Sequence, residues 1–238
     1  MKISFIYSTS DAVGRTIKSL GYKFEEIDED ITDFKYNKGD TIIVFSRHES
    51  SSKKPSITVH YPGNPSDKAM GGEPNTLGIA FPKLLTAIYR ELKKINVNVE
   101  KAIEATHHGP TYQKVPVIFV EIGSSLEFWS NKCLVKELVE STLKAVDSYD
   151  NTDCKERIVG FGGSHYTPYF SKLADTFCIG HVISKYYIEN LKEEVVLQVL
   201  QKSVERIDKV MFDNVRKDIR DRISSIITKR FNVKLESR

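Results

Sequence analysis

Six histidines are the residues of this 238-residue chain whose types and positions are best suited to chemistry. All six fall at or just beyond the carboxyl end of a stretch that is predicted to be a β-strand: His48, His60, His107, His108, His165 and His181. In open α/β sheets the loops at this edge surround a crevice in which ligands bind. One histidine in such a place is more often a hydrogen-bonded structural residue. Six in equivalent places predict a shared site.

Glu121 strengthens this prediction because it interrupts the otherwise apolar stretch "VIFVEIG". An ionised carboxylate in a buried strand needs a cation, a metal or a proton to offset its desolvation, and a structural ion pair is one alternative. Histidines and a glutamate around one cavity can bind zinc and leave a position open for water. Without metal, the same set could act as general base and electrostatic stabiliser when water attacks an ester. The sequence has no H-E-x-x-H motif, so a metal site would have to combine distant segments.

The stretch "GFGGSHYTP" is the remaining candidate for chemistry. A strand that ends in glycines and then turns toward a helix offers backbone N–H groups to a phosphate or an oxyanion. Ser164 lacks the G-x-S-x-G arrangement of a nucleophilic serine. The glycine spacing is also no dinucleotide fingerprint, because it lies late in the chain. Glycines that only form a tight turn are the structural alternative.

These residues must be positioned by alternating strands and helices, a pattern typical of an α/β fold in a single domain. We predict strands at 2–7, 41–48, 56–62, 99–107, 115–124, 177–183 and 208–213, and one that enters the glycine turn from 157. Apolar spacing predicts helices at 81–95 and 128–146, and two more around the last strand. A further helix follows the first strand, with Thr9 or Ser10 as its N-cap and Gly21 as its end. The strand at 115–124 is apolar nearly throughout, so we expect it to be central.

The composition is that of an ordinary globular protein, with 40% hydrophobic and 28% charged residues. No apolar run approaches the roughly 20 residues of a membrane-spanning helix. The first apolar stretch is too short for a signal peptide, so we expect a cytoplasmic protein without a membrane partner. The cysteines Cys133, Cys154 and Cys178 form no C-x-x-C pair, and we expect them to be reduced.

The net charge of +3 permits an anionic partner without requiring one. Basic residues gather near the end of the chain: Arg216, Lys217, Arg220, Arg222, Lys229 and Arg230. Asp218 and Asp221 lie among them, so a solvated helix face is the alternative to a nucleic-acid contact.

Five motifs, "SRHES", "SITVHYPGNP", "THHGPT", "VEIGSS" and "GGSHYTP", occur in this order along the chain. With them the sequence resembles the D-aminoacyl-tRNA deacylases of archaea and plants over essentially its whole length. The resemblance implies a phosphorylase/hydrolase-like α/β fold, with a mixed sheet flanked by helices in one domain over residues 1–238. It also implies that a D-amino acid is released from tRNA by ester hydrolysis, as proofreading in translation, and that zinc is required.

The resemblance also marks residues of the site. The catalytic residues and tentative zinc ligands are His48, His107, His108, Glu121 and His165. The substrate-binding residues are Arg47, His60, Asn64, Thr106, Gly109, Thr111, Gly162, Gly163 and Tyr166. The family often has a basic residue after the last motif, where this chain has Tyr169.

The working hypothesis is that the imidazole cluster with Glu121 holds zinc and a water that attacks the aminoacyl carbonyl. The loop at 63–75 would cover the pocket, and Arg47, Lys114 and the late basic segment would contact the tRNA acceptor stem. Rival hypotheses are a peptidyl-tRNA hydrolase-like enzyme, a nucleoside phosphorylase-like enzyme and a non-catalytic RNA-binding module. The expected partner is tRNA charged with a D-amino acid, and a monomer is favoured.

Overall fold

A computed structural model describes residues 1–50 and 53–238 of the chain. The strands are β1 (Ile3–Ser8), β2 (Glu25–Ile27), β3 (Thr41–His48), β4 (Ser56–His60), β5 (Gly63–Asn64), β6 (Thr76–Leu77), β7 (Glu100–Ile103), β8 (Val117–Gly123), β9 (Arg157–Gly162), β10 (Cys178–Ile183), β11 (Lys209–Asp213) and β12 (Lys234–Ser237). The helices are α1 (Ala12–Ser19), α2 (Pro82–Leu92), α3 (Leu126–Trp129), α4 (Lys132–Ser148), α5 (Pro168–Leu173), α6 (Glu193–Gln201) and α7 (Lys217–Thr228), with 3-10 turns at Tyr149–Asn151 and Ile188–Asn190. The α/β class and the mixed sheet flanked by helices are confirmed.

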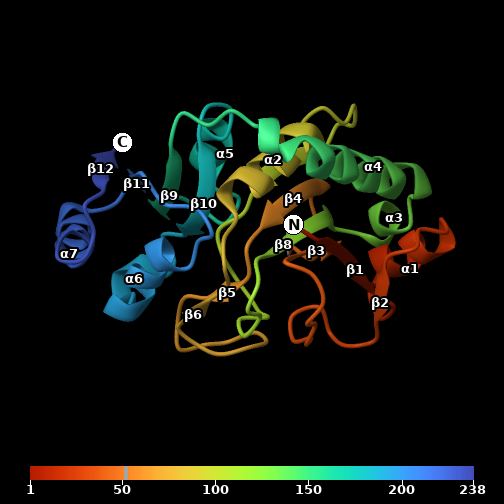
Figure 1. The fold of residues 1–238 in the computed structure, drawn as a ribbon, viewed down its shortest axis with the longest axis horizontal. Coiled ribbons are helices and arrows are strands. Elements are labelled where there is room, and N and C mark those ends of the chain that lie inside the picture. The colour runs from red at the N-terminus through yellow and green to blue at the C-terminus, as the bar shows by residue number, and fades with distance from the viewer. Residues whose placement is uncertain (51–52) are drawn as a thin grey trace.

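The larger sheet has six strands in the order β2-β1-β3-β8-β4-β7. β2, β1, β3 and β8 are parallel to one another, β4 is antiparallel to β8, and β7 is parallel to β4. Helices α1, α2 and α4 lie along one side of this sheet, and long loops lie along the other (Figure 1). As predicted, β8 is an interior strand.

The two faces of this sheet differ because successive side chains of a strand point to opposite faces. Alternate residues such as Phe45 and Val120 pack with the helices in the main hydrophobic core. On the opposite face, Phe34 of the 28–40 loop packs on the first part of the strands. Further along the same face, the side chains are polar and buried, as at Ser46 and Glu121. The face without helices therefore has room for a site.

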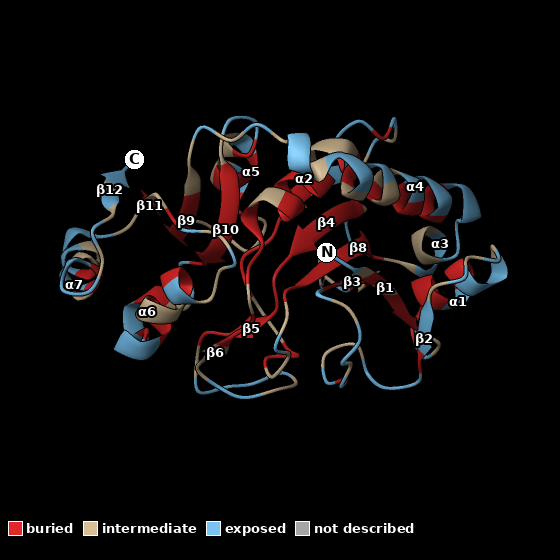
Figure 2. Ribbon diagram, viewed as in Figure 1, coloured by how far each residue is buried: buried red, intermediate tan, exposed pale blue. Residues whose placement is uncertain are grey.

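The smaller sheet has four parallel strands in the order β10-β9-β11-β12. Its strands carry apolar residues on both faces, and α6 and α7 cover one of them through buried residues such as Val199 and Ile223. Figure 2 shows the buried strands at the centre of the molecule and the exposed outer sides of the helices. The sequence predicted these elements except β12, and it did not predict their separation into a second sheet.

Several element boundaries differ from the predictions. The N-cap of α1 is Asp11, whose side chain accepts hydrogen bonds from the N–H groups of Val13 and Gly14. The predicted helix at 128–146 is two helices, because Asn131 caps the start of α4. The predicted strand at 99–107 ends at Ile103, and β2, β5, β6 and β12 were not predicted. These four strands have two to four residues, too few for a clear alternating pattern.

The expectation that all cysteines are reduced is wrong for two of them. Cys154 and Cys178 form a disulfide with their Cα atoms 5.4 Å apart, and Cys133 is free and exposed. Cys178 begins β10 and Cys154 shortly precedes the neighbouring β9, so the parallel pairing of these strands brings the two cysteines together. The two cysteines are 24 residues apart, so the sequence alone did not indicate that they form a bond. Over residues 1–50 and 53–238, no helix is long and apolar enough to cross a membrane.

Candidate active site

A cavity of about 630 Å³ opens on the face of the six-stranded sheet that has no helices. It is lined by all five residues that were predicted to be catalytic, namely His48, His107, His108, Glu121 and His165. Arg47, Asp11, Asp30 and Met70 line the same cavity. The predicted convergence of distant imidazoles in one hollow is therefore present in the structure.

Strand register explains how the rings meet at Glu121. Glu121 on β8 is paired with Ser46 on β3 and with Thr58 on β4. His48 and His60 lie two residues beyond these partners, so their side chains share the face of Glu121. His48 Nδ1 is 3.4 Å and His60 Nε2 is 3.7 Å from Glu121 Oε2. The neighbouring strands therefore present two imidazoles to one carboxylate.

The prediction of one common carboxyl edge for all six histidines is wrong in two respects. Because β4 is antiparallel to β8, His60 and His48 leave their strands in opposite directions, and the site lies across the face of the sheet. His181 lies within β10, fully buried, and its ring contacts Thr106 Oγ1 at 2.9 Å and the Gly78 carbonyl oxygen at 3.2 Å. His181 thus belongs to the core between the sheets.

Glu104 is a central residue of the cluster that the sequence reasoning missed. Its side chain is fully buried, and its carboxylate lies 3.1 Å from His48 Nδ1, 3.6 Å from His107 Nε2 and 3.4 Å from His165 Nε2. Within the described part of the chain, neither oxygen of Glu104 has a hydrogen-bond partner. It lies three residues before His107 in a predicted strand that also contains Glu100 and Lys101, so its charge did not stand out in the sequence as that of Glu121 did.

Three imidazoles of the cluster share one hydrogen-bonding pattern. The Nδ1 atoms of His60, His107 and His108 contact the backbone carbonyl oxygens of Tyr61, Ala105 and Gly109 at 3.1, 2.9 and 2.7 Å. Each ring can therefore donate its Nδ1–H to a carbonyl, which leaves Nε2 as an unprotonated donor for a metal. The ligand atoms of these three residues lie within 4.8 Å of one another. Metal-binding histidines commonly donate their other ring N–H to a backbone carbonyl in this way.

Burial and neighbouring charges set the protonation of the cluster. Burial lowers the pKa of His108 to about 4, and the nearby His60 adds to this effect. Burial also lowers the pKa of His107 well below its usual value, as do the neighbouring imidazoles. Burial opposes ionisation of Glu121, but the adjacent imidazoles of His48 and His60 outweigh it and hold the pKa of this carboxyl well below normal. His107 and His108 are therefore neutral and Glu121 is ionised, which are the forms that bind zinc. Burial lowers the pKa of His60 too, but the neighbouring Glu121 outweighs this effect and raises it.

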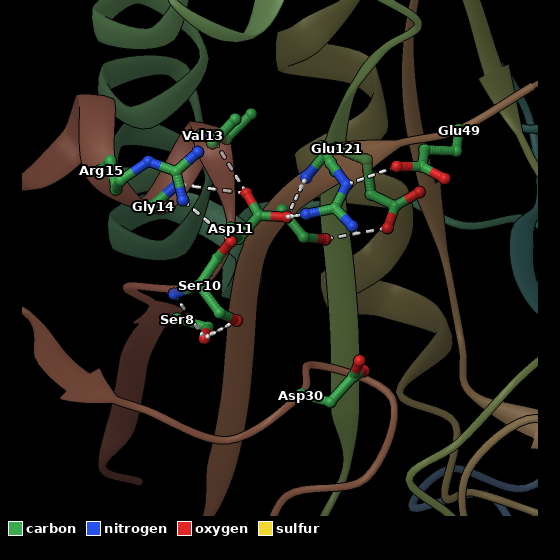
Figure 3. Close-up of polar contacts among 12 residues, drawn as sticks. Ser8, Ser10, Asp11, Val13, Gly14, Arg15, Asp30, Glu49 and Glu121 are labelled. Atoms are coloured by element: carbon green, nitrogen blue, oxygen red, sulfur yellow. Dashed lines mark hydrogen bonds and ion pairs between the residues drawn. The ribbon is translucent and has the colours of Figure 1, made fainter.

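A polar network positions Arg47 at the wall of the cavity. The buried Asp11 accepts the Arg47 backbone N–H at 3.2 Å and its guanidinium at 3.4 Å, while it also caps α1. Arg47 also contacts Glu49 at 2.7 Å. Figure 3 shows Asp11 at the centre of this network and Asp30 on the loop that faces the strand of Glu121. Backbone and side-chain hydrogen bonds from Thr32 lower the pKa of Asp30, which keeps it ionised.

The predicted substrate-binding residues divide into three groups. His60 lies in the cluster, and the Tyr166 hydroxyl is 2.9 Å from His48 Nε2, where it contacts the cluster directly. Other residues support the loops behind the cavity: Asn64 bonds to Met70, Gly71 and Glu73, Thr111 to Glu73, Gly109 to Met70, and Thr106 to His181 and Val182. Gly162 is the last residue of β9, and Gly163, which follows it, lines a separate cavity.

The surface features named as tRNA contacts lie apart from one another. Helix α7, with the late basic residues, is at the opposite end of the molecule from α1 (Figure 1). Two of its cations are engaged within the fold, since Arg222 donates to the carbonyls of Ile188 and Leu191 and Arg216 pairs with Glu189. Met70, at the tip of the 63–75 loop, lines the cavity, as expected for a loop that covers it.

Comparisons with known proteins agree with this arrangement. A profile of the family described as D-aminoacyl-tRNA deacylase matches residues 35–235. A D-aminoacyl-tRNA deacylase of Sulfurisphaera tokodaii is 66% identical over 227 residues, which cover 95% of this chain and 96% of the relative. The chain belongs to the D-aminoacyl-tRNA deacylase family. The family assignment therefore rests on nearly the full length of both proteins.

Other members of the deacylase family are similar over the whole chain. Proteins of this name from Saccharolobus islandicus and Saccharolobus solfataricus are 57% and 56% identical over 238 residues, with both chains fully covered. A crystal structure of a conserved protein of unknown function is 25% identical, with a TM-score of 0.87 over 99% of this chain and 95% of that one. The fold of this deacylase family member thus has a close experimental counterpart.

Proposed function

We propose that this chain releases D-amino acids from tRNA by hydrolysing the aminoacyl ester, and that its histidine cluster holds zinc for this reaction. The family and its relatives support the reaction class. The zinc proposal is supported by one observation above all, the three imidazoles of His60, His107 and His108. Each has its Nδ1 at a backbone carbonyl and its ligand atom within 4.8 Å of the others. Three histidines are a frequent zinc-binding set.

The chemistry of the neighbouring residues also fits a cation. Among the described residues, His60 Nε2 and both oxygens of Glu104 lack hydrogen-bond partners although they are buried. Buried polar atoms without partners are costly, so a cation near them would stabilise the folded protein. His48, Glu104 and His165 form a second group of ligand atoms within 4.8 Å of one another. Imidazoles and carboxylates are the ligands that zinc accepts.

When bound, zinc supplies a Lewis acid that lowers the pKa of water toward about 7 and polarises an ester carbonyl. The remaining work falls to side chains. His165 has the most exposed ring of the cluster, with 39% of its side chain accessible, and its Nε2 is 3.4 Å from Glu104. A carboxylate behind an imidazole orients it as a general base. Because Nε2 faces Glu104, the other ring nitrogen, His165 Nδ1, takes a proton from the attacking water and returns it to the departing ribose oxygen.

Selection of D- over L-aminoacyl esters follows from three contacts that hold the substrate in the site. The ester carbonyl lies at the histidine cluster, the ribose lies toward Ser164, and the α-ammonium of the amino acid binds the ionised Asp30 at the cavity wall. Three fixed groups leave one direction for the amino-acid side chain. The D- and L-amino acids point their side chains in different directions from these contacts. The proposal is that the D side chain points into the open part of the cavity and the L side chain toward its wall, so the L-substrate is rejected by contact.

The experiment is a deacylation assay on matched D-Tyr-tRNA and L-Tyr-tRNA. The proposal predicts release of D-tyrosine at a rate at least about a hundredfold above that of L-tyrosine. Equal rates would reject the stereochemical part, and no release of either would reject the reaction. Release of a blocked peptide from peptidyl-tRNA, or phosphate-dependent nucleoside cleavage, would favour the two rival enzymes.

Metal analysis of the same purified protein tests which histidines bind zinc and whether His165 acts as a base. One zinc per chain, lost from a triple variant of His60, His107 and His108, supports the assignment above. Two zinc ions per chain would make His48, Glu104 and His165 ligands of a second ion, and would reject the role of His165 as a base. A chain without zinc that still hydrolyses D-Tyr-tRNA would reject the metal proposal.

A further inference from the structure

A second cavity lies at the carboxyl edge of the four-stranded sheet. After β9 the chain forms β10, which lies on one side of β9. It later forms β11, which lies on the other side of β9. The loops after β9 and β11 therefore leave in opposite directions, and ligands bind in the crevice that such a change of strand order creates. The cavity has a volume of about 480 Å³ and is lined by Gly163, Ser164, Lys185, Asp213, Asn214 and Arg238.

Glycines shape this cavity. Gly162 and Gly163 have φ angles of +106° and +73°, which side chains rarely allow. A Cβ on Gly162 would lie 2.2 Å from the carbonyl oxygen of Asp213, and one on Gly163 would lie 2.9 Å from the Asp213 carboxylate. Only glycine lets the chain turn this closely against the end of β11. The turn leaves Asp213 beside Ser164 at the cavity wall.

The side chains around the cavity match the parts of a nucleotide. Lys185 is an exposed cation, and its Nζ is 5.5 Å from the centre of the Tyr186 ring. Tyr186 is 68% exposed, so its ring can stack with a base. Asp213 can accept a hydrogen bond from a hydroxyl group, and Arg238 Nη1 lies 3.5 Å from its carboxylate. A lysine beside an exposed aromatic ring is a common combination in proteins that bind single-stranded nucleic acid.

This cavity adjoins the histidine cavity through two consecutive residues. Ser164 lines the first and His165 lines the second. Consecutive Cα atoms are about 3.8 Å apart, so the two cavities meet at one step of the backbone. A nucleotide in the cavity at Gly163 and Asp213 would therefore lie next to the residue that carries the His165 ring.

We propose that the cavity at Gly163, Lys185 and Asp213 binds the 3′-terminal nucleotide of the tRNA. The phosphate contacts Lys185, the base stacks on Tyr186, and a ribose hydroxyl donates to Asp213. This inference rests on the proposed function, because that function supplies the nucleic-acid substrate. It adds the place where the nucleotide binds, separate from the residues that act on the ester.

The first experiment measures KM and kcat for D-Tyr-tRNA with Lys185→Ala and Tyr186→Ala. Loss of one phosphate or stacking contact should raise KM about tenfold, and the effect should fall on KM rather than kcat. Lys136→Ala is the matched control, since Lys136 is an exposed lysine on α4 whose side chain is 59% accessible. Lys185→Ala should also reduce the salt dependence of KM, because one fewer counterion is released on binding. An unchanged KM in both variants would overturn the inference.

The second experiment uses the trinucleotide CCA, the common 3′ end of tRNA, as a probe without an ester. CCA should compete with D-Tyr-tRNA on the wild-type protein, and Lys185→Ala and Tyr186→Ala should weaken this competition. Direct titration of CCA reports binding even in a protein without deacylase activity, so failure of the nucleotide site is distinguishable from failure of the proposed reaction. Binding of CCA that is equal in wild type, Lys185→Ala and Tyr186→Ala would contradict the proposal.

Discussion

The two faces of the six-stranded sheet are built from the same strands but have opposite character. In β8, Val120 and Ile122 point into the helix-covered core, while Glu121 between them points into the histidine cavity. The apolar face buries side chains that need no partners. The other face buries carboxylates and imidazoles that are favourable only when charges or a metal offset their desolvation. One face of the sheet thus stabilises the fold, and the other is available for chemistry.

The largest expected effect is on the polar face, at His108. His108→Ala removes one of the three imidazoles whose Nδ1 atoms contact backbone carbonyls, and we expect kcat for D-Tyr-tRNA to fall by at least about a hundredfold. The fold should persist, because the apolar clusters on both faces of the sheet are left in place. Zinc content and the thermal midpoint measured on the same sample serve as controls. Turnover equal to wild type would remove His108 from the catalytic cluster.

The next test compares neighbouring residues of β8 that point to opposite faces. Ile122→Ala leaves a cavity in the apolar core and should lower the free energy of unfolding by about 2–5 kcal/mol, with kcat near wild type. Glu121→Gln is nearly isosteric and should instead lower kcat and zinc affinity, because it removes the charge beside His48 and His60. Denaturant unfolding and kinetics on both variants provide the comparison. If Ile122→Ala abolished activity at full stability, the division between faces would be wrong.

His181 provides a pH test of a buried histidine outside the cluster. Burial lowers its pKa from 6.5 to about 4. A group with a depressed pKa binds its proton more weakly in the folded state, so its stabilising contribution is present above pH 6.5 and is lost as the pH falls toward 4. The loss should reach about 3 kcal/mol for this one group. In His181→Gln, the curve of unfolding free energy against pH should be flatter by this amount, and an unchanged curve would contradict the shift.

The smallest effect is expected at the wall of the cavity, at Asp30. Asp30→Asn removes the charge proposed to bind the α-ammonium group, and KM for D-Tyr-tRNA should rise about tenfold. Discrimination against L-Tyr-tRNA should also weaken, because one of the three contacts is lost. Asp28→Asn on the same loop is the matched control, since Asp28 does not line the cavity. Equal KM values for both variants would exclude Asp30 from substrate binding.

The sequence predicted much of the fold because long apolar stretches alternate with amphipathic ones. It also identified the five catalytic candidates, since strand ends and a charge in an apolar strand can be recognised without a structure. It did not predict the antiparallel direction of β4, so the site lies on a face of the sheet rather than at one edge. Glu104 was missed because only the fold places its carboxylate among His48, His107 and His165. The Cys154–Cys178 bond likewise depends on the pairing of β9 and β10.

The most direct test of the central claim is a zinc titration of metal-stripped protein with D-Tyr-tRNA hydrolysis as the readout. The account predicts that stripped protein has almost no activity, and that the rate rises in proportion to bound zinc until the histidine cluster is filled. His108→Ala should bind less zinc and recover little activity under the same conditions. Full activity of the stripped wild-type protein, independent of added zinc, would contradict the account.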